Sequence, residues 1–311
     1  MRRTPSLLVL AVATSVALPV AAASADGASL AKRGIPLKRA AAVTSAPPMI
    51  TYSISNEARS ELETLDPNSG TTKKIAASTD IIEANAWSVT TARVYYSFDD
   101  TDRDSAPAGT DSVPEAGGAP TQDIMTGNQT DISQDGSTFV FVGDDSNLYK
   151  RPVAGGDPVR LTGAGGLKPR FSPDGTRIVF TRVVGNNLDV FTIGADGTGL
   201  KRITAAGNID FSGVFSPDGK RLMFTRITDD GPVIYAVNLD GTNKRVVATD
   251  AVDPDWASNG WIGYLALDDN DIAQVAVLSP GIRGEESLLT NNGIDASAMR
   301  FRSGQAAPVA T

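Results

Sequence analysis

A twelve-residue segment occurs twice in this chain, and this repeat restricts the possible folds more than any other feature. Residues 171–182 read FSPDGTRIVFTR, and residues 215–226, which lie 44 positions later, read FSPDGKRLMFTR. Weaker copies begin at Ile132 and Trp256, and fainter ones at Trp87 and near Met299. The copies are spaced 39 to 45 residues apart, so the chain is expected to consist of similar units that pack against their neighbours.

Each unit carries two turn signals. Ser-Pro-Asp-Gly is suited to a type I turn, because Pro fixes φ at the second position and Gly completes the fourth. A second signal follows 22 to 31 residues after the start of the unit, and in two units it is Asp-Gly-Thr, which favours a tight hairpin. A carboxylate inside such a turn can accept backbone N–H bonds. We therefore assign a structural role to the recurrent acids Asp135, Asp174, Asp218, Asp196 and Asp240.

Short β-rich runs lie between the turns, for example residues 177–181, 189–193 and 200–204. Four short strands in about 42 residues is the period of a propeller blade. Residues 49–53, 61–65 and 72–76 supply only three strands, while residues 295–302 supply a single strand at the other end. The sequence therefore predicts an all-β fold over residues 49–302: a six-bladed β-propeller of four-stranded antiparallel blades, closed by one C-terminal strand joining three N-terminal strands. Closure of this kind also removes an exposed sheet edge.

These repeats resemble a known family. The anchor Phe/Trp-Ser-Pro-Asp-Gly, followed by a hydrophobic strand and a later Asp-Gly hairpin, is similar to the WD-repeat-like Pro-Asp repeats of the TolB-type β-propeller. The resemblance is strongest at Phe171 and Phe215, and it implies an exported scaffold that binds a partner on its propeller. The α/β domain that precedes the propeller in that family has no counterpart in residues 26–48, so a role in the Tol-Pal envelope system is not expected.

The N-terminus has the features of a secretory signal peptide at residues 1–25. Arg2 and Arg3 precede an apolar run from Leu7 to Ala23, and residues 23–25 form a small-x-small cleavage site. A membrane anchor is the alternative, but the run is short and contains Pro19. We expect an exported chain, secreted or periplasmic, with no transmembrane anchor after processing; the sequence does not separate Sec from twin-arginine export. Residues 26–48 are expected to form a basic flexible linker, and residues 303–311 a C-terminal tail.

Composition excludes several kinds of chemistry. The chain has no His and no Cys, so it cannot contain a disulfide, a Cys-ligated metal or a His-dependent catalytic triad. The formal net charge is −8, and residues 1–25 and 26–48 contribute +2 and +3, which leaves −13 on residues 49–311. This acidic body argues against nucleic acid as a partner. It favours a cationic or metal-ion ligand. The expected partner is a protein or peptide, in particular a cationic one, or a component of the cell envelope, and the chain is expected to be a monomer.

Acidic residues also cluster in the segments that lead into the anchor strands. Because these segments converge at one end of a propeller channel, we predict an acidic ligand-binding mouth there. The candidate residues are Asp80, Glu83, Asp210, Asp253, Asp255 and Asp295, with Arg170 as a basic member. The aromatic residues Trp87, Trp256, Phe171 and Phe215 are expected to pack within blades rather than to form a ligand platform.

One loop superficially resembles a calcium site. Asp100, Asp102 and Asp104 alternate as in a calcium loop, but the Gly and Glu that such a loop needs are missing, so a solvated loop is favoured. We assign no catalytic residue and no cofactor other than this weak calcium candidate. Two functions remain open: a non-catalytic binding scaffold, which we favour, and a carboxylate-dependent hydrolase or lyase acting on an extracellular polymer. The second would need a close pair of buried carboxylates in the channel.

Overall fold

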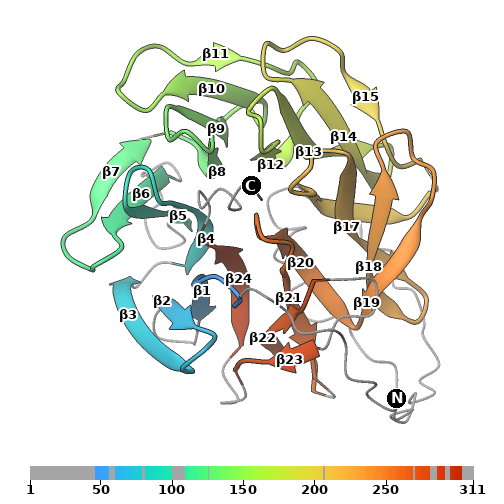
Figure 1. Ribbon diagram of the computed structural model, residues 1–311. Helices are drawn as coiled ribbons and strands as arrows, with labels where there is room; N and C mark the ends of the chain where they lie inside the picture. Colours follow the sequence, from blue (N-terminus) through green and yellow to red (C-terminus); the bar gives the residue numbers. More distant parts are fainter. Residues whose placement is uncertain are drawn as a thin grey trace, which may run out of the picture.

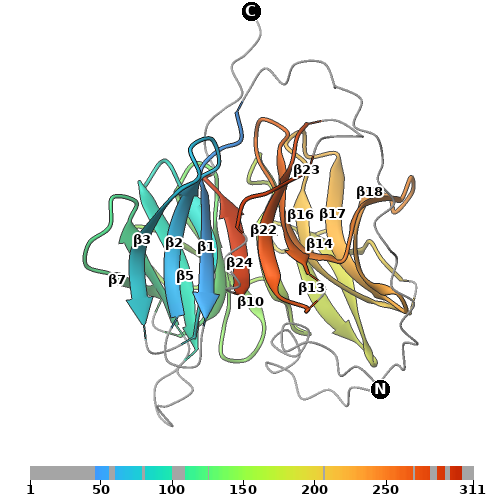
Figure 2. The same ribbon diagram turned by 90° about the horizontal axis from the view of Figure 1, so that it is seen from below.

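The computed structural model describes residues 46–55, 60–78, 81–99, 109–124, 126–205, 207–268, 270–280, 286–290 and 295–302. Within these residues it contains six four-stranded antiparallel sheets arranged as blades around a central channel (Figure 1). Seen from the side, the blades stand next to one another and their strands run roughly along the channel axis (Figure 2). The predicted all-β, six-bladed propeller is therefore confirmed. The predicted signal peptide, nearly all of the predicted linker and all of the predicted tail lie outside the described residues.

The strands follow chain order within every blade except the first. Blade I contains β1 (Ile50–Ser55), β2 (Ser60–Asp66), β3 (Thr71–Ser78) and β24 (Ala296–Phe301). Blade II contains β4 (Ile81–Ser88), β5 (Arg93–Asp99), β6 (Gly109–Pro114) and β7 (Thr121–Ile124). Blade III contains β8 (Asn128–Ile132), β9 (Thr138–Val142), β10 (Leu148–Pro152) and β11 (Val159–Arg160).

The second half of the ring repeats this arrangement. Blade IV contains β12 (Leu167–Phe171), β13 (Arg177–Val184), β14 (Asn187–Gly194) and β15 (Lys201–Arg202). Blade V contains β16 (Ile209–Phe215), β17 (Arg221–Thr228), β18 (Gly231–Asn238) and β19 (Arg245–Thr249). Blade VI contains β20 (Ala251–Trp256), β21 (Ile262–Leu267), β22 (Ala273–Leu278) and β23 (Glu286–Leu288). No helix among the described residues is long and apolar enough to cross a membrane.

Ring closure occurs where the sequence predicts it. The C-terminal strand β24 pairs antiparallel with β1, and Ile50 lies opposite Phe301 in this register. In Figure 1 the last strand, β24, drawn in red, lies beside the first, β1, drawn in blue, with β24 as the innermost strand of the blade. One blade is thus built from both ends of the domain, so folding of the ring depends on a contact between its most distant segments.

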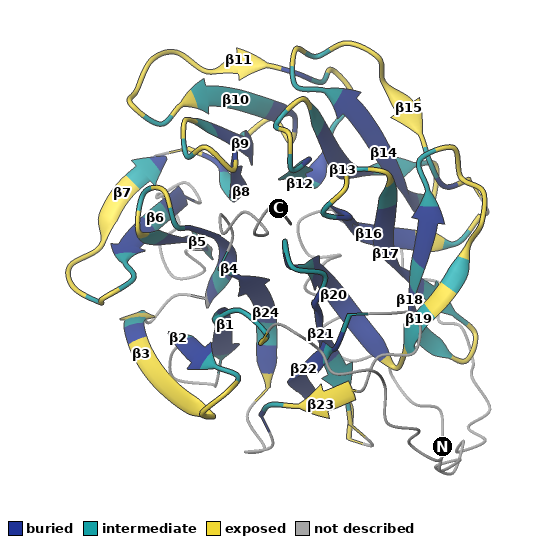
Figure 3. Ribbon diagram, in the orientation of Figure 1, coloured by how far each residue is buried: buried dark blue, intermediate teal, exposed yellow. Residues whose placement is uncertain are grey.

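The hydrophobic core lies between neighbouring blades. Figure 3 shows that the inner strands are mostly buried and that the outermost strands are the most exposed. One core cluster, for example, joins Val214 and Met223 of blade V to Ala251 and Tyr264 of blade VI. Each blade buries its faces against the next blade, and apolar burial is the main favourable contribution to stability.

The anchor turns carry the hydrogen bonds that their residues imply. The N–H of Gly175 donates to the carbonyl of Ser172 at 2.8 Å, and φ of Gly175 is 68°, a region that glycine adopts without strain. Oδ1 of Asp174 accepts from the Ser172 hydroxyl at 2.6 Å and from the N–H of Thr176 at 3.0 Å. The Ser172 bond is the main reason that the pKa of Asp174 lies below its ordinary value.

All five recurrent aspartates occupy such turns. Asp135 and Asp218 accept from the hydroxyls of Ser133 and Ser216, each at 2.6 Å. Asp196 and Asp240 accept from the backbone N–H two residues later, each at 2.9 Å. Each pKa is lowered, because these bonds favour the ionised carboxylate. The structure therefore places all five at turns, in agreement with the role assigned to them from the repeat.

Candidate functional site

Every inner strand is interrupted by a β-bulge near its middle. In blades III to VI, the bulge places a non-glycine residue at positive φ: Gln129 at 51°, Lys168 at 48°, Ser212 at 53° and Asp253 at 50°. A bulge inserts one extra residue and changes the direction of the side chains around it. These four residues occupy equivalent positions, four before the Ser or Ala that starts the anchor turn. The repeated bulge therefore determines which side chains line the channel.

One ion-pair cluster in the channel is centred on Arg170 of β12. Its Nη2 donates to Oδ1 of Asp255 at 2.8 Å, and its Nε lies 3.6 Å from Oδ1 of Asp131. Each carboxylate also accepts a backbone N–H from the following blade: Asp131 from Phe171 at 2.7 Å and Asp255 from Phe301 at 2.8 Å. Both acids are therefore already engaged in holding neighbouring inner strands together.

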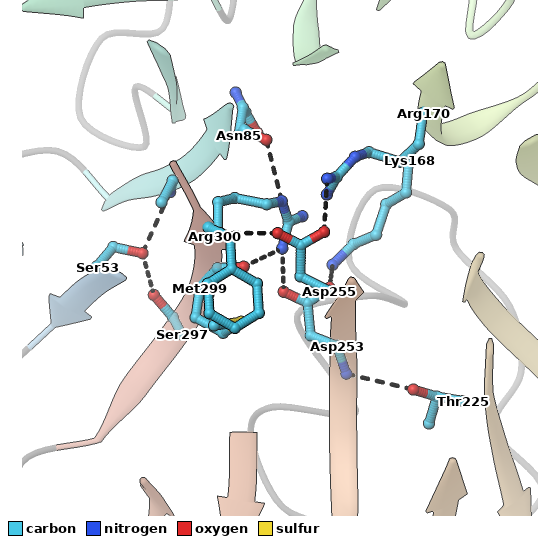
Figure 4. A network of polar contacts seen from close by, with 12 residues as sticks. Ser53, Asn85, Lys168, Arg170, Thr225, Asp253, Asp255, Ser297, Met299 and Arg300 are labelled. Carbon is cyan, nitrogen blue, oxygen red and sulfur yellow. Dashed lines mark hydrogen bonds and ion pairs between the residues drawn. The ribbon is translucent and has the colours of Figure 1, made fainter. Parts of the chain in front are cut away.

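A second cluster is centred on Asp253 of β20 (Figure 4). Nη1 of Arg300 donates to its Oδ2 at 2.7 Å, Nζ of Lys168 lies 3.9 Å from its Oδ1, and the Thr225 hydroxyl accepts its N–H at 3.2 Å. Nε of Arg300 also donates to the carbonyl of Asn85 at 3.0 Å, which connects β24 to blade II. The cluster thus links blades I, II, IV, V and VI across the channel.

The pKa of an aspartate is lowered in one cluster and raised in the other. Burial disfavours the charged form of Asp253, but Arg300 and Lys168 outweigh it and hold its pKa well below the usual range. Burial raises the pKa of Asp131, although Arg170 and the N–H of Phe171 oppose the increase. Burial would lower the pKa of Arg170, but its carboxylate neighbours raise it.

These contacts correct the expectation of an acidic mouth. Asp253 and Asp255 are each only 4% exposed, and the three acids of the two clusters face three cations: Lys168, Arg170 and Arg300. Asp210 is fully buried and forms two bonds to Arg226, from Nε at 2.6 Å and from Nη2 at 2.7 Å. None of the three predicted ligand-binding acids Asp210, Asp253 and Asp255 lines an open acidic surface, because the fold turns them inward onto arginines.

The other predicted site residues do not join these clusters. Glu83 is half-buried on β4, and Asp295 is exposed just before β24, where its Oδ1 accepts from the N–H of Ala273 at 2.8 Å. Asp80 and the calcium candidates Asp100, Asp102 and Asp104 lie outside the described residues. No group of three or more acidic side chains suited to a metal ion is found in the part of the chain that the structure describes.

An open hollow lies at the end of the channel where the inner strands finish, opposite the end at which the acidic mouth was predicted. It has a volume of about 240 Å³ and is lined by the last residues of the inner strands and by the anchor turns that follow them; we call it the funnel. Its walls include Phe171, Phe215 and Trp256, its rim includes Pro173, Pro217, Gln134 and Ser258, and its floor is formed by Asp131, Arg170 and Asp255. We call this end of the ring, which carries the anchor turns, the turn face.

The funnel shows where reasoning from the sequence succeeded and where it failed. All three aromatic residues line the funnel: Phe215 is buried within the ring as expected, with the Arg177 guanidinium 5.1 Å from its ring centroid, whereas Phe171 and Trp256 are partly exposed. Arg170, which was predicted for the acidic mouth, lies instead on the floor of the funnel, and its role as the centre of an ion-pair cluster was missed. The available signal was the position two residues before the anchor Ser or Ala, which holds Asp131, Arg170 and Asp255 in three blades.

This arrangement suits binding better than carboxylate catalysis. A glycosidase-type mechanism needs two carboxyl groups that are free to exchange protons with a substrate. Asp131 and Asp255 do lie on the funnel floor, and the pKa of Asp131 is raised, but Arg170 and two backbone N–H groups engage their oxygens. Apolar walls around a few polar groups are typical of ligand-binding pockets.

Comparisons with known proteins agree with this fold. Residues 165–299 match the family model of the TolB beta propeller domain. TolB from Acinetobacter baumannii superposes with a TM-score of 0.70 at 17% identity, covering 82% of this chain and 67% of that protein. A putative TolB from Agrobacterium tumefaciens gives 0.64 at 18% identity, covering 76% of this chain and 90% of the other. No curated protein sequence matches.

A chain from a complex unrelated by name to TolB has a TM-score between those of the two TolB structures. A chain of a nidogen/laminin complex gives a TM-score of 0.66 at 13% identity, covering 83% of this chain and 99% of that one. At such identities, structural similarity shows a shared fold only. The resemblance to the TolB-type propeller predicted from the repeats is thus confirmed at the level of the fold.

Proposed function

We propose that this protein is an exported, non-catalytic scaffold that binds a peptide segment of a partner protein in the funnel on the turn face. The observation that carries the proposal is the funnel itself, which combines aromatic walls with an arginine-containing floor. Hot spots of protein interfaces are buried pockets that receive one large anchoring side chain. A volume of about 240 Å³ is smaller than most small-molecule sites and suits such an anchor.

The charges around the funnel narrow the expected chemistry of the partner. The floor acids Asp131 and Asp255 are paired with Arg170, and Arg302 on the wall is bonded through both Nε and Nη2 to Glu115 at 3.0 Å. With these groups paired, the contact in the funnel should depend mainly on shape and apolar burial. The acidic body acts at longer range, where it should accelerate association with a cationic partner in a salt-dependent manner.

A panning experiment tests the proposal. The mature chain would be used to select peptides from a phage-displayed random library, and selected peptides would be titrated against two variants. Gln134→Arg places a bulky side chain at the exposed rim of the funnel, and Asn186→Arg makes the same change at an exposed hairpin on the opposite face. We expect peptides whose affinity falls at least tenfold with Gln134→Arg and is unchanged with Asn186→Arg. Equal binding to both variants would exclude the funnel as the site.

A further inference from the structure

A second, much smaller cavity lies next to the funnel and shares Arg170 with it. Its volume is about 10 Å³, which is enough for one water-sized particle. Three bulge residues from three successive inner strands line it: Lys168, Ser212 and Asp253. Their φ angles of 48°, 53° and 50° show that the same local conformation presents each residue to the same space.

Two of these residues offer hydrogen-bond donors that no described residue accepts. Oγ of Ser212 is buried without a partner, in a residue that is 5% exposed. Nζ of Lys168 lies 3.9 Å from Oδ1 of Asp253, which is beyond hydrogen-bonding distance, although the Lys168 side chain is only 17% exposed. A buried donor without an acceptor, such as the Ser212 hydroxyl, is costly, and the partly buried ammonium of Lys168 lies beside it, so the cavity is suited to a ligand that accepts hydrogen bonds.

Charge identifies the kind of acceptor. Arg170 and Arg300 also line the cavity, but Arg170 is paired with Asp131 and Asp255, and Arg300 with Asp253. Among the described residues, Lys168 is therefore the lining cation that has no carboxylate within hydrogen-bonding distance. Asp253 directs Oδ2 to Arg300 through a 2.7 Å bond. The ammonium of Lys168 therefore favours a negatively charged acceptor over a neutral one, because charge-assisted hydrogen bonds are the stronger ones. The volume excludes phosphate, sulfate and carboxylates.

We propose that this cavity binds a single halide-sized anion, chloride under physiological conditions, held by the ammonium of Lys168 and the hydroxyl of Ser212. The flexible four-carbon chain of Lys168 can adjust to an ion slightly larger than water. The ion would lie at the junction of blades IV, V and VI, where it would bridge donors that the repeats leave unpaired.

Thermal unfolding in different salts tests the site. Sodium chloride would be titrated against sodium gluconate at constant ionic strength, so that general screening stays fixed. We expect Tm to rise with chloride and to saturate, because a ligand that binds only the folded state stabilises it. Ser212→Ala removes an unpartnered hydroxyl, so it should leave Tm in gluconate unchanged and weaken the apparent chloride affinity at least tenfold. Lys168→Met should abolish the chloride effect, and Lys220→Met, at an exposed turn residue, should preserve it.

A direct observation complements the titration. Crystals soaked in sodium bromide should show an anomalous peak between residues 168 and 212, which should be absent in Ser212→Ala crystals. A Tm that responds equally to chloride and gluconate, or a bromide-soaked crystal with only water in the cavity, would overturn the proposal. The Ser212→Ala arm keeps the test decisive even if Lys168→Met does not fold.

Discussion

The junction between blades IV and V and the junction made by β24 hold adjacent blades together by different means. At the first, Arg177 lies over the Phe215 ring and its Nη2 donates to the carbonyl of Gly219 at 2.8 Å, and Arg221 lies in the same way over Trp256 at the next junction. At the second, Arg300 bonds Asp253 and the Asn85 carbonyl, and Arg302 bonds Glu115. Repeated junctions therefore use residues of the anchor motif itself, whereas closure adds the ion pairs of Arg300 and Arg302 to contacts of the repeated kind, such as Arg302 over the Trp87 ring.

The difference has an energetic consequence. The Arg177 contacts are partly exposed, where a cation–π contact contributes about 0.5–1 kcal/mol. The Arg300–Asp253 pair is buried, with side chains 9% and 6% exposed. Breaking a buried pair leaves an uncompensated charge in a poorly solvated site, which costs far more. Substitutions at the closing junction should therefore reduce the free energy of unfolding more than substitutions at the repeated junction.

The most disruptive change is deletion of residues 295–311. It removes β24, exposes the edge of β1 that β24 pairs with, and leaves Asp253 and Asp255 without Arg300 and the N–H of Phe301. We expect loss of cooperative thermal unfolding and a tendency to aggregate, measured by calorimetry and light scattering. Deletion of residues 306–311 alone should change little. If the 295–311 deletion melts like the full mature chain, the shared blade does not hold the ring closed.

A point substitution tests the same junction more finely. Arg300→Met should destabilise the protein by about 3–5 kcal/mol in urea unfolding, because Asp253 stays buried without its main partner. Adding Asp253→Asn should recover much of this loss. Arg177→Met, at the repeated junction, should cost about 1 kcal/mol. Equal costs for Arg300→Met and Arg177→Met would remove the contrast between the two junctions.

Acid should weaken closure through Asp253. Its folded-state pKa lies below that of an unfolded Asp, about 3.9, so its contribution to stability is fully present above that value and is lost as pH falls through the folded-state pKa. The pKa values of the turn aspartates are also lowered, so their contributions to stability are likewise lost as the pH falls. We expect the unfolding free energy to fall below about pH 4, less steeply in the Arg300→Met/Asp253→Asn variant than in the parent chain. Parallel curves for the two proteins would contradict this assignment.

The smallest expected effect lies in the repeats. Asp218→Ala removes the acceptor of the Ser216 hydroxyl at 2.6 Å and the Lys220 N–H at 3.1 Å, so it should cost about 1 kcal/mol. Peptide binding in the funnel should remain intact once the protein is folded. Loss of binding at unchanged Tm would mean that this turn carboxylate belongs to the binding surface.

The sequence alone was sufficient for the architecture. Ser-Pro-Asp-Gly and Asp-Gly turns are encoded by residues within a few positions of one another, so the turns, the blade period and the turn roles of Asp174 and Asp218 could be predicted locally. The three N-terminal strands and the lone C-terminal strand predicted closure, because an incomplete blade has an edge that must be paired.

Only the tertiary structure decided the character of the channel. The partners of Asp253 and Asp255 lie far away in sequence: Arg300 is 47 residues from Asp253, and Arg170 is 85 residues from Asp255. Whether an acid is exposed or paired also depends on bulges at Lys168, Ser212 and Asp253, where no glycine marks the positive φ. Side-chain direction reverses with each residue along a strand, so one inserted residue changes which charges meet. That is why the positions of the acids along the chain could be read from the sequence, whereas their pairing with cations and the open funnel at the turn face could not be predicted from it.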